Sequence, residues 1–208
     1  RAWLVSGLEV VTAMVMEEEF EISHREIGLA VGSCFIIATP LMVLGAFAKK
    51  VADPPTLLIS LAVAVAVLCL LIFHFPADAL RLRDTASLAF LLAADTLIYP
   101  AAMTLGGMLQ GLALGYAIIP RSRVYSSSVA VIGGEMLVSG VGRFLSMPIS
   151  RLLVANGGRD TYAAVQFVMA CLSLLSCIRI APVVRTLVQQ DAISRASSAG
   201  DLQAAQTK

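Results

Sequence analysis

Long apolar segments, separated by short charged or proline-containing segments, dominate the 208-residue sequence. A helix needs about 20 mainly apolar residues to cross a bilayer. On that criterion the pattern predicts six membrane-spanning helices, at about residues 2–16, 27–48, 55–73, 87–119, 129–154 and 162–180. We therefore expect an all-α, multi-pass transmembrane helical bundle over residues 1–188, and a flexible cytoplasmic tail over residues 189–208, which are rich in Ala, Ser and Gln.

The six predicted spans differ in polarity. The third contains no charged residue, which suits a helix that is largely surrounded by lipid. The fourth is too long for one straight crossing, so we expect it to be tilted or to continue beyond the bilayer. The fifth carries Glu135 and Arg143, whose insertion cost of about 5 to 7 kcal/mol is similar to the gain from its apolar residues. We expect this helix to insert with both charges facing protein.

The composition agrees with a lipid environment. Hydrophobic residues make up 58% and charged residues 14% of the chain, and the mean hydropathy is +0.86. A soluble domain carries about 25% charged residues. The net charge of +1 gives no basic field that would attract nucleic acid, so we expect no nucleic-acid partner. The four cysteines lack the close paired spacing of zinc sites, and we predict no metal, no cofactor and no disulfide.

The ends of the predicted spans indicate an orientation. Basic residues are more frequent on the side that holds both termini, which favours cytoplasmic termini. The acidic run Glu17–Glu21 would then face the lumen or the exterior. Because the chain opens with Arg1 directly before an apolar segment, we expect it to be part of a longer protein.

Polar side chains are unevenly distributed over the spans. The first span carries Glu9 and the fourth carries Asp95, whereas the third and sixth are almost without polar residues. Further candidates recur at helical spacing on the fourth and fifth spans: Tyr99, Gln110, Glu135, Ser139 and Arg143. We infer four inner helices that line a cavity and two peripheral helices.

Glu9, Asp95 and Arg143 are expected at a similar depth. At 1.5 Å per residue, each lies about 12 to 16 Å from the end of its span on the side of the acidic run. A guanidinium with two carboxylates at one level could bind a small anion, while a carboxylate gains and loses a proton. The alternative is that Arg143 pairs with a carboxylate only to hold helices together. For Glu135, a role in the solute pathway and a role in pairing helices both stay open.

Catalytic chemistry has little support in the sequence. His24 and His74 fall in predicted loops, so the sequence offers no general base to form a catalytic pair with a serine inside the membrane. Tyr99 and Gln110 also suit ordinary hydrogen-bonded packing between helices. We therefore expect no catalytic residues and no enzyme activity.

Two segments resemble a known transporter family. Leu8–Phe20, with Glu9 and Glu17 at acidic positions, resembles the start of the seventh helix of SPX-MFS proteins. These proteins form the branch of the major facilitator superfamily that includes vacuolar phosphate transporters. Gly142–Pro148, followed by Asn156–Arg159, resembles the eleventh helix and the loop into the twelfth. The likeness covers most of residues 1–181, although the loop at Lys49 and Lys50 departs from the usual facilitator signature.

The resemblance implies the C-terminal six-helix half of a major facilitator fold, whose partner is the missing N-terminal half of the same parent chain. It implies alternating access, with inorganic phosphate or another small anion as the solute, protons as a coupling ion, and a vacuolar or other endomembrane location. Two alternatives stay open. One is a facilitator for organic solutes in which Arg143 belongs to a gate ion pair, and the other is a non-transporting membrane scaffold or receptor.

Overall fold

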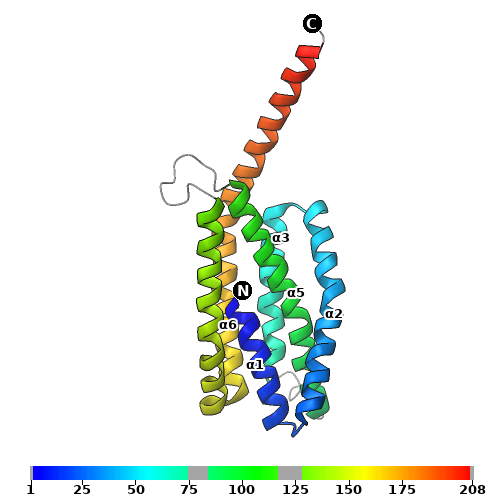
Figure 1. Ribbon diagram of the computed structural model, residues 1–208, viewed down its shortest axis with the longest axis vertical. Helices are drawn as coiled ribbons and strands as arrows, with labels where there is room; N and C mark the ends of the chain where they lie inside the picture. The colour runs from blue at the N-terminus through cyan, green and yellow to red at the C-terminus, as the bar shows by residue number, and fades with distance from the viewer. Residues whose placement is uncertain (1, 75–83, 117–127, 207–208) are drawn as a thin grey trace.

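The structure is a computed structural model that describes residues 2–74, 84–116 and 128–206. Within these residues the chain forms five α-helices and one 3-10 helix, and it forms no strand. The elements are α1 (Ala2–Glu18), α2 (His24–Val51), α3 (Pro54–Leu68), η1 (Cys69–Ile72), α5 (Asp84–Tyr116) and α6 (Ser128–Gln206). Figure 1 shows the helices side by side along one long axis, with α1 beginning about half-way along the bundle.

Local sequence signals explain where the helices begin. The backbone N–H and the hydroxyl of Ser23 both donate hydrogen bonds to the Glu26 carboxylate, which closes the first turn of α2. α3 begins at Pro54 after Asp53, whose carboxylate accepts a hydrogen bond from the Thr56 hydroxyl at 2.8 Å. Proline suits this position because its missing N–H would have no helical partner there. The predicted starts at residues 27 and 55 therefore shift by only a few residues.

The predicted count of six separate helices is not what the structure has. The predicted fifth and sixth spans both lie on α6, which is interrupted at Gly158, where φ is 72° and ψ is −179°. That backbone conformation is open to glycine and strained for other residues. Figure 1 shows α6 turning back at the lower end of the bundle, so we call the part before Gly158 the first arm of α6 and the part after it the second arm. The second arm continues as a helix to Gln206, through most of the segment predicted to be a flexible tail.

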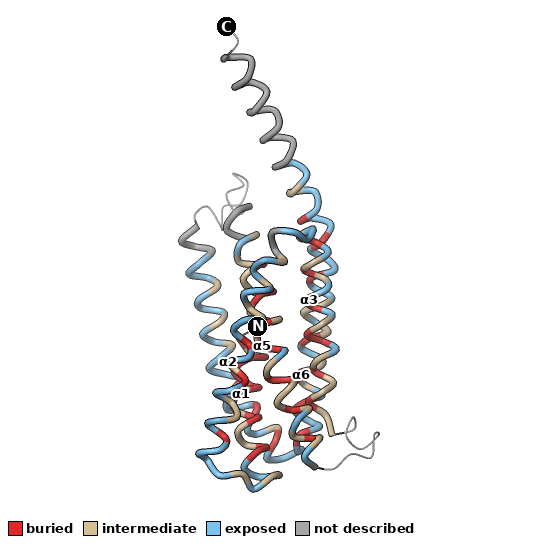
Figure 2. The backbone as a smooth tube through the Cα atoms, turned by 90° about the vertical axis from the view of Figure 1, so that its right-hand side faces the viewer, coloured by how far each residue is buried: buried red, intermediate tan, exposed pale blue. Residues whose placement is uncertain are grey.

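The bundle core lies where α1, α3, α5 and α6 meet. Its buried side chains come from all four helices and from η1, and they include Leu8, Val11, Leu91, Ile98 and Tyr162. α1 packs chiefly against α6, and α2 packs chiefly against α5. Figure 2 shows the buried positions gathered on the inner faces of the helices, with much of α2 exposed. All four cysteines are unpaired, as the sequence predicted.

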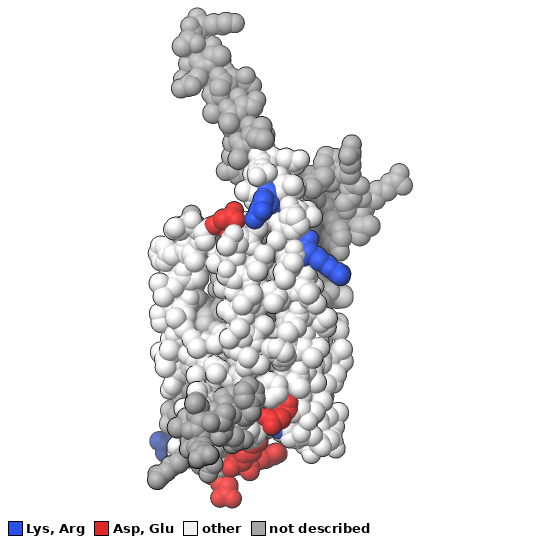
Figure 3. Space-filling model, turned by 180° about the vertical axis from the view of Figure 1, so that it is seen from behind, with Lys and Arg blue, Asp and Glu red and all other residues white. Residues whose placement is uncertain are grey.

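The outer surface of the bundle is apolar. Large hydrophobic side chains are exposed on α2 and on both arms of α6, including Ile36, Leu44, Phe144 and Leu172. Four helical stretches in the described residues are long and apolar enough to cross a membrane: His24–Ala48, Pro54–Ile72, Thr85–Leu112 and Ile132–Gln190. In Figure 3 charged side chains gather near the two ends of the bundle, and a broad band between them is almost free of charge.

Candidate functional site

The seven sequence-predicted site residues lie on three helices. Glu9 is on α1, and α5 and α6 carry the others: Asp95, Tyr99 and Gln110 on α5, and Glu135, Ser139 and Arg143 on α6. Asp95 is the most buried of them, with 5% of its surface exposed. Arg143 is exposed on the first arm of α6, and the other five are partly buried. The bundle therefore presents these polar groups at different depths from its surface.

Glu9, Asp95 and Arg143 form one electrostatic group. The charge of Arg143 acts on Glu9, and the charge of Glu9 acts on Asp95, so three helices contribute to it. Among the described residues, no ion pair within 4.0 Å joins Arg143 to either carboxylate. The guanidinium therefore acts on Glu9 without a direct ion pair, and Glu9 in turn acts on Asp95.

Gln110, Glu135 and Ser139 form a second group. The Gln110 side-chain amide donates to the Glu135 carboxylate at 3.5 Å, and the Ser139 hydroxyl donates to the other oxygen of that carboxylate at 3.0 Å. These contacts connect α5 to the first arm of α6. Glu135 therefore has hydrogen-bond donors on two helices, which is the arrangement expected of a residue that helps helices to pair.

Tyr99 belongs to neither group. Its ring packs edge-on against Phe35 of α2, with ring centroids 4.9 Å apart and an interplanar angle of 89°. This geometry is a favourable aromatic contact in a helix interface. The structure therefore places Tyr99 in the packing between α2 and α5.

A buried polar cluster that the sequence reasoning missed lies beside Gly7. The Ser150 hydroxyl and the Gln166 amide nitrogen are each 2.7 Å from the position that a Cβ on Gly7 would take, and the Tyr162 hydroxyl is 3.3 Å from it. Gln166 Nε2 donates to the Tyr162 hydroxyl at 2.6 Å. Ser150, Tyr162 and Gln166 each expose at most 1% of their surface. The i, i+4 spacing of Tyr162 and Gln166 was the available sequence signal.

Several buried side-chain oxygens have no hydrogen-bond partner in the described structure. They are the Ser150 and Thr12 hydroxyl oxygens, Asp95 Oδ2 and Gln166 Oε1. The charge of Asp95, on α5, acts on the Tyr162 phenol without a hydrogen bond between the two side chains in the described residues. A buried polar atom is costly unless a protein group, an ordered water or a bound species satisfies it.

Arg159 forms a different kind of site near the turn of α6. Its Nε donates to the Ile72 carbonyl oxygen, and its terminal nitrogens donate to the Ser87 hydroxyl at 2.8 Å and to the Ser87 carbonyl at 3.5 Å. Its guanidinium is 3.9 Å from the Glu19 carboxylate. Beside it, the His74 backbone N–H donates to Asp160 at 2.9 Å. This Arg159 junction ties η1, α5 and α6 to the end of α1.

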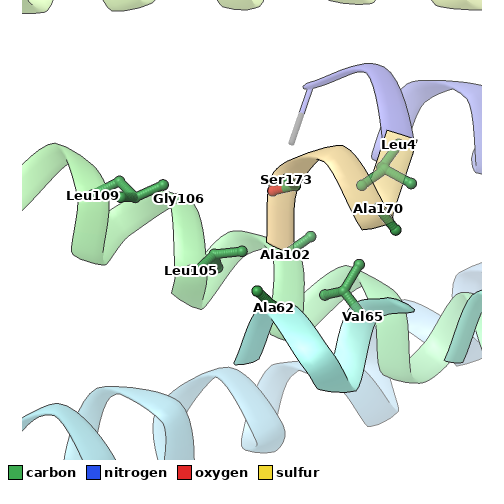
Figure 4. A pocket seen from close by; sticks show the side chains of 9 residues that line it. All are labelled: Leu4, Ala62, Val65, Ala102, Leu105, Gly106, Leu109, Ala170 and Ser173. Atoms are coloured by element: carbon green, nitrogen blue, oxygen red, sulfur yellow. The ribbon is translucent and has the colours of Figure 1, made fainter. Parts of the chain in front are cut away.

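The bundle also holds a small apolar cavity of about 40 Å³. It lies where α1, α3, α5 and the second arm of α6 meet, as Figure 4 shows. Its lining is Leu4, Ala62, Val65, Ala102, Leu105, Gly106, Leu109, Ala170 and Ser173. The lining is apolar apart from Ser173, and none of the predicted site residues belongs to it.

Comparisons with known proteins return no match to this chain among family models, curated proteins or solved structures. The class of protein therefore follows from the fold. The described part of the chain is helical without strands, and its four long apolar helical stretches are compatible with a membrane protein. No group of three or more His, Cys, Asp or Glu side chains in the described residues is placed to hold a metal ion.

Proposed function

We propose that the chain is one half of a secondary active transporter of the major facilitator type, and that it moves a small anion such as inorganic phosphate. The observation that carries the proposal is the electrostatic group of Glu9, Asp95 and Arg143, to which three helices contribute. Charged residues among membrane helices are expensive and usually serve a pathway. The resemblance of two segments to SPX-MFS proteins supports the choice of anion.

In this mechanism Arg143 contacts the anion. A guanidinium presents several fixed N–H donors that match phosphate oxygens, and its exposure on α6 leaves it open to a solute held between two bundles. Glu9 and Asp95 balance the charge, because one carboxylate takes up a proton when the anion enters. Alternating access then requires a second six-helix bundle that faces this one across the site. Both termini lie on the cytoplasmic side of a vacuolar or other internal membrane.

The test is phosphate flux into proteoliposomes that contain the full-length protein. Arg143→Gln keeps a polar side chain of moderate size but removes the charge, and Arg151→Gln is the matched control because Arg151 is an exposed arginine two turns along the same arm. Loss of a charge-assisted contact with phosphate predicts a fall in initial rate of about ten- to a hundred-fold for Arg143→Gln. Arg151→Gln is expected to keep the wild-type rate.

Folding and coupling are controlled in the same experiment. Each variant is compared at equal amounts of protein that elutes as a single species, and flux is measured with and without a pH gradient. A rate that rises with an inward proton gradient supports coupling through Glu9 or Asp95. Equal flux in wild type and Arg143→Gln would remove Arg143 from the site. A wild type that moves organic solutes but not phosphate would favour the facilitator alternative, and a wild type that moves neither would favour the scaffold.

A further inference from the structure

The chain has two histidines, and each lies beside a carboxylate of the acidic run that joins α1 to α2. His24 Nε2 is 3.7 Å from Glu17 Oε1, and His74 Nε2 is 3.4 Å from Glu19 Oε1. Figure 3 shows acidic side chains gathered at the lower end of the bundle. Histidine is the side chain whose charge changes between about pH 5 and 8. Both contacts therefore become ion pairs when the pH falls through that range.

The two contacts differ in their surroundings. The side chains of His24 and Glu17 are 84% and 54% exposed, so water screens their attraction. Those of His74 and Glu19 are only 38% and 29% exposed. The second oxygen of the Glu19 carboxylate lies 3.9 Å from Arg159, whose side chain is fully buried. The contact of His74 therefore continues into the Arg159 junction, whereas that of His24 stays at the surface.

His74 is held on two sides at the point where η1 ends. Its imidazole faces Glu19 at the end of α1, and its backbone N–H donates to the Asp160 carboxylate of α6 at 2.9 Å. The charged side chains around it within the described residues are thus Glu19 of α1 together with Arg159 and Asp160 of α6. The start of α5 contributes the uncharged Ser87 to the junction. His74 therefore adjoins three separate parts of the bundle.

The charges of this group are unbalanced when the imidazole is neutral. Two carboxylates, of Glu19 and Asp160, then stand against the single guanidinium of Arg159, and one negative charge remains. Protonation of His74 makes the group neutral and places a cation beside each oxygen of the Glu19 carboxylate. Contacts between two charged partners are stronger than those with a neutral partner. The protonated imidazole should therefore hold the end of α1 more firmly than the neutral one.

We propose that His74 acts as a proton-sensitive clasp, which holds the end of α1 against the Arg159 junction in acid and releases it as the pH rises. An imidazolium attracts a carboxylate, whereas a neutral imidazole does not. The clasp is therefore present below about pH 6 and is lost as the pH rises above about 7. Since α1 also carries Glu9, the clasp restrains the helix that brings this carboxylate to the proposed anion site. That consequence rests on the proposed function, whereas the clasp itself does not.

Hydrogen exchange of backbone amides at the end of α1 measures the clasp without any transport. The amides of Glu19 and Ile22 donate to the carbonyls of Val15 and Met16 at 2.9 and 3.1 Å, so their exchange reports the opening of this end. The full chain in detergent is labelled at about pH 5.5 and about pH 7.5. Each variant is divided by wild type at the same pH, which removes the chemical effect of pH on exchange.

Matched variants separate the two histidines. His74→Gln keeps a neutral polar side chain, and it should speed exchange of the peptide containing Glu19 and Ile22 about two- to four-fold at pH 5.5, with no change at pH 7.5. His24→Gln is the control, because it removes the other imidazole beside the acidic run. Its exchange should stay within about 1.5-fold of wild type at both pH values, since its contact is more exposed.

A double variant identifies the partner of His74. In a Glu19→Gln background the carboxylate that the imidazolium attracts is absent, so adding His74→Gln should have no further effect at either pH. Both proteins of this pair carry the same residues in the measured peptide, so the chemical rate of exchange is equal in them. A further acceleration of two-fold or more at pH 5.5 would overturn the pairing with Glu19.

Other outcomes would also contradict the clasp. Equal acceleration by His74→Gln at both pH values would mean that the side chain contributes packing rather than charge. A larger response to His24→Gln than to His74→Gln would place the pH dependence at the surface contact. A pH response at His74 in a protein that moves no phosphate would refute the proposed function alone. Phosphate flux without that response would refute the clasp alone.

Discussion

Arg159 and Asp95 are both buried charged residues in one helical bundle, but their surroundings differ. Arg159 donates hydrogen bonds to Ile72 and Ser87 and lies 3.9 Å from Glu19. Asp95 keeps an oxygen with no hydrogen-bond partner in the described residues. Arg159 lies near the turn of α6, and each of its side-chain nitrogens donates a hydrogen bond. Asp95 lies within the core and retains an oxygen that accepts none from the described part of the chain.

The difference separates a structural charge from one that can act on a ligand. A buried charge whose partners are all supplied by the protein fixes the positions of the elements that carry them. A buried carboxylate with a free oxygen contributes no such fixing, and its burial opposes folding unless something binds it. The Arg159 junction should therefore matter most for stability, and Asp95 should matter most for binding and transport. Four predictions test that division, ordered by the expected change in stability.

Replacement of Arg159 should have the largest effect on stability. Arg159→Gln removes the guanidinium that joins η1, α5 and α6, and leaves the Ile72 carbonyl and the Ser87 hydroxyl without their donors. We expect a loss of about 3 kcal/mol in the free energy of unfolding, measured by titration with SDS in mixed micelles. Arg151→Gln, at an exposed arginine, should change it by less than about 0.5 kcal/mol. Equal losses in both variants would contradict a special role for Arg159.

Gly7→Ala should have the next largest effect. The new methyl group would meet Ser150 and Gln166 at 2.7 Å, so these side chains must move from α1. Overpacking of this kind costs about 1 to 3 kcal/mol. Gly32→Ala on α2 is the matched control, since no atom lies within 4 Å of its added methyl group. If both glycine variants unfold at the same SDS concentration, the result would contradict the close packing of Gly7 against Ser150 and Gln166.

Glu19→Gln should have a small effect, and it divides the Arg159 junction into its parts. The Glu19 side chain is 29% exposed and its oxygen lies 3.9 Å from Arg159, so water screens much of the attraction. We expect a loss of less than about 1 kcal/mol in the same SDS titration, with Glu18→Gln as an exposed control. A loss as large as that of Arg159→Gln would mean that the ion pair, rather than the hydrogen bonds to Ile72 and Ser87, holds the junction.

Much of the fold could be predicted from hydrophobic periodicity. The predicted span at residues 87–119 corresponds to α5 (Asp84–Tyr116), with residues 117–119 outside the described part of the chain, and the predicted first span to α1. Depth arithmetic also predicted one level for Glu9, Asp95 and Arg143, and the charge of Glu9 acts on Asp95 while that of Arg143 acts on Glu9. Their role in solute binding stays a prediction, because a pattern of charges does not say what they bind.

The Arg159 junction and the cluster beside Gly7 could not be predicted in the same way. An arginine that follows Gly157 and Gly158 has the local sequence of a solvated turn. Its burial depends on the positions that η1 and the first turn of α5 take in the folded bundle. Gly7 similarly carries no polarity of its own. Its importance comes from the two arms of α6, which approach it from residues more than 140 positions away. Tertiary contacts decide both sites.

Asp95→Asn should have the smallest effect on stability. The amide removes a buried charge that has a free oxygen, so the free energy of unfolding in the same SDS titration should stay within about 0.5 kcal/mol of wild type or rise. Asp53→Asn, at the exposed start of α3, should also stay within about 0.5 kcal/mol of wild type. A loss of about 3 kcal/mol for Asp95→Asn would place Asp95 with Arg159, as a charge that holds helices together.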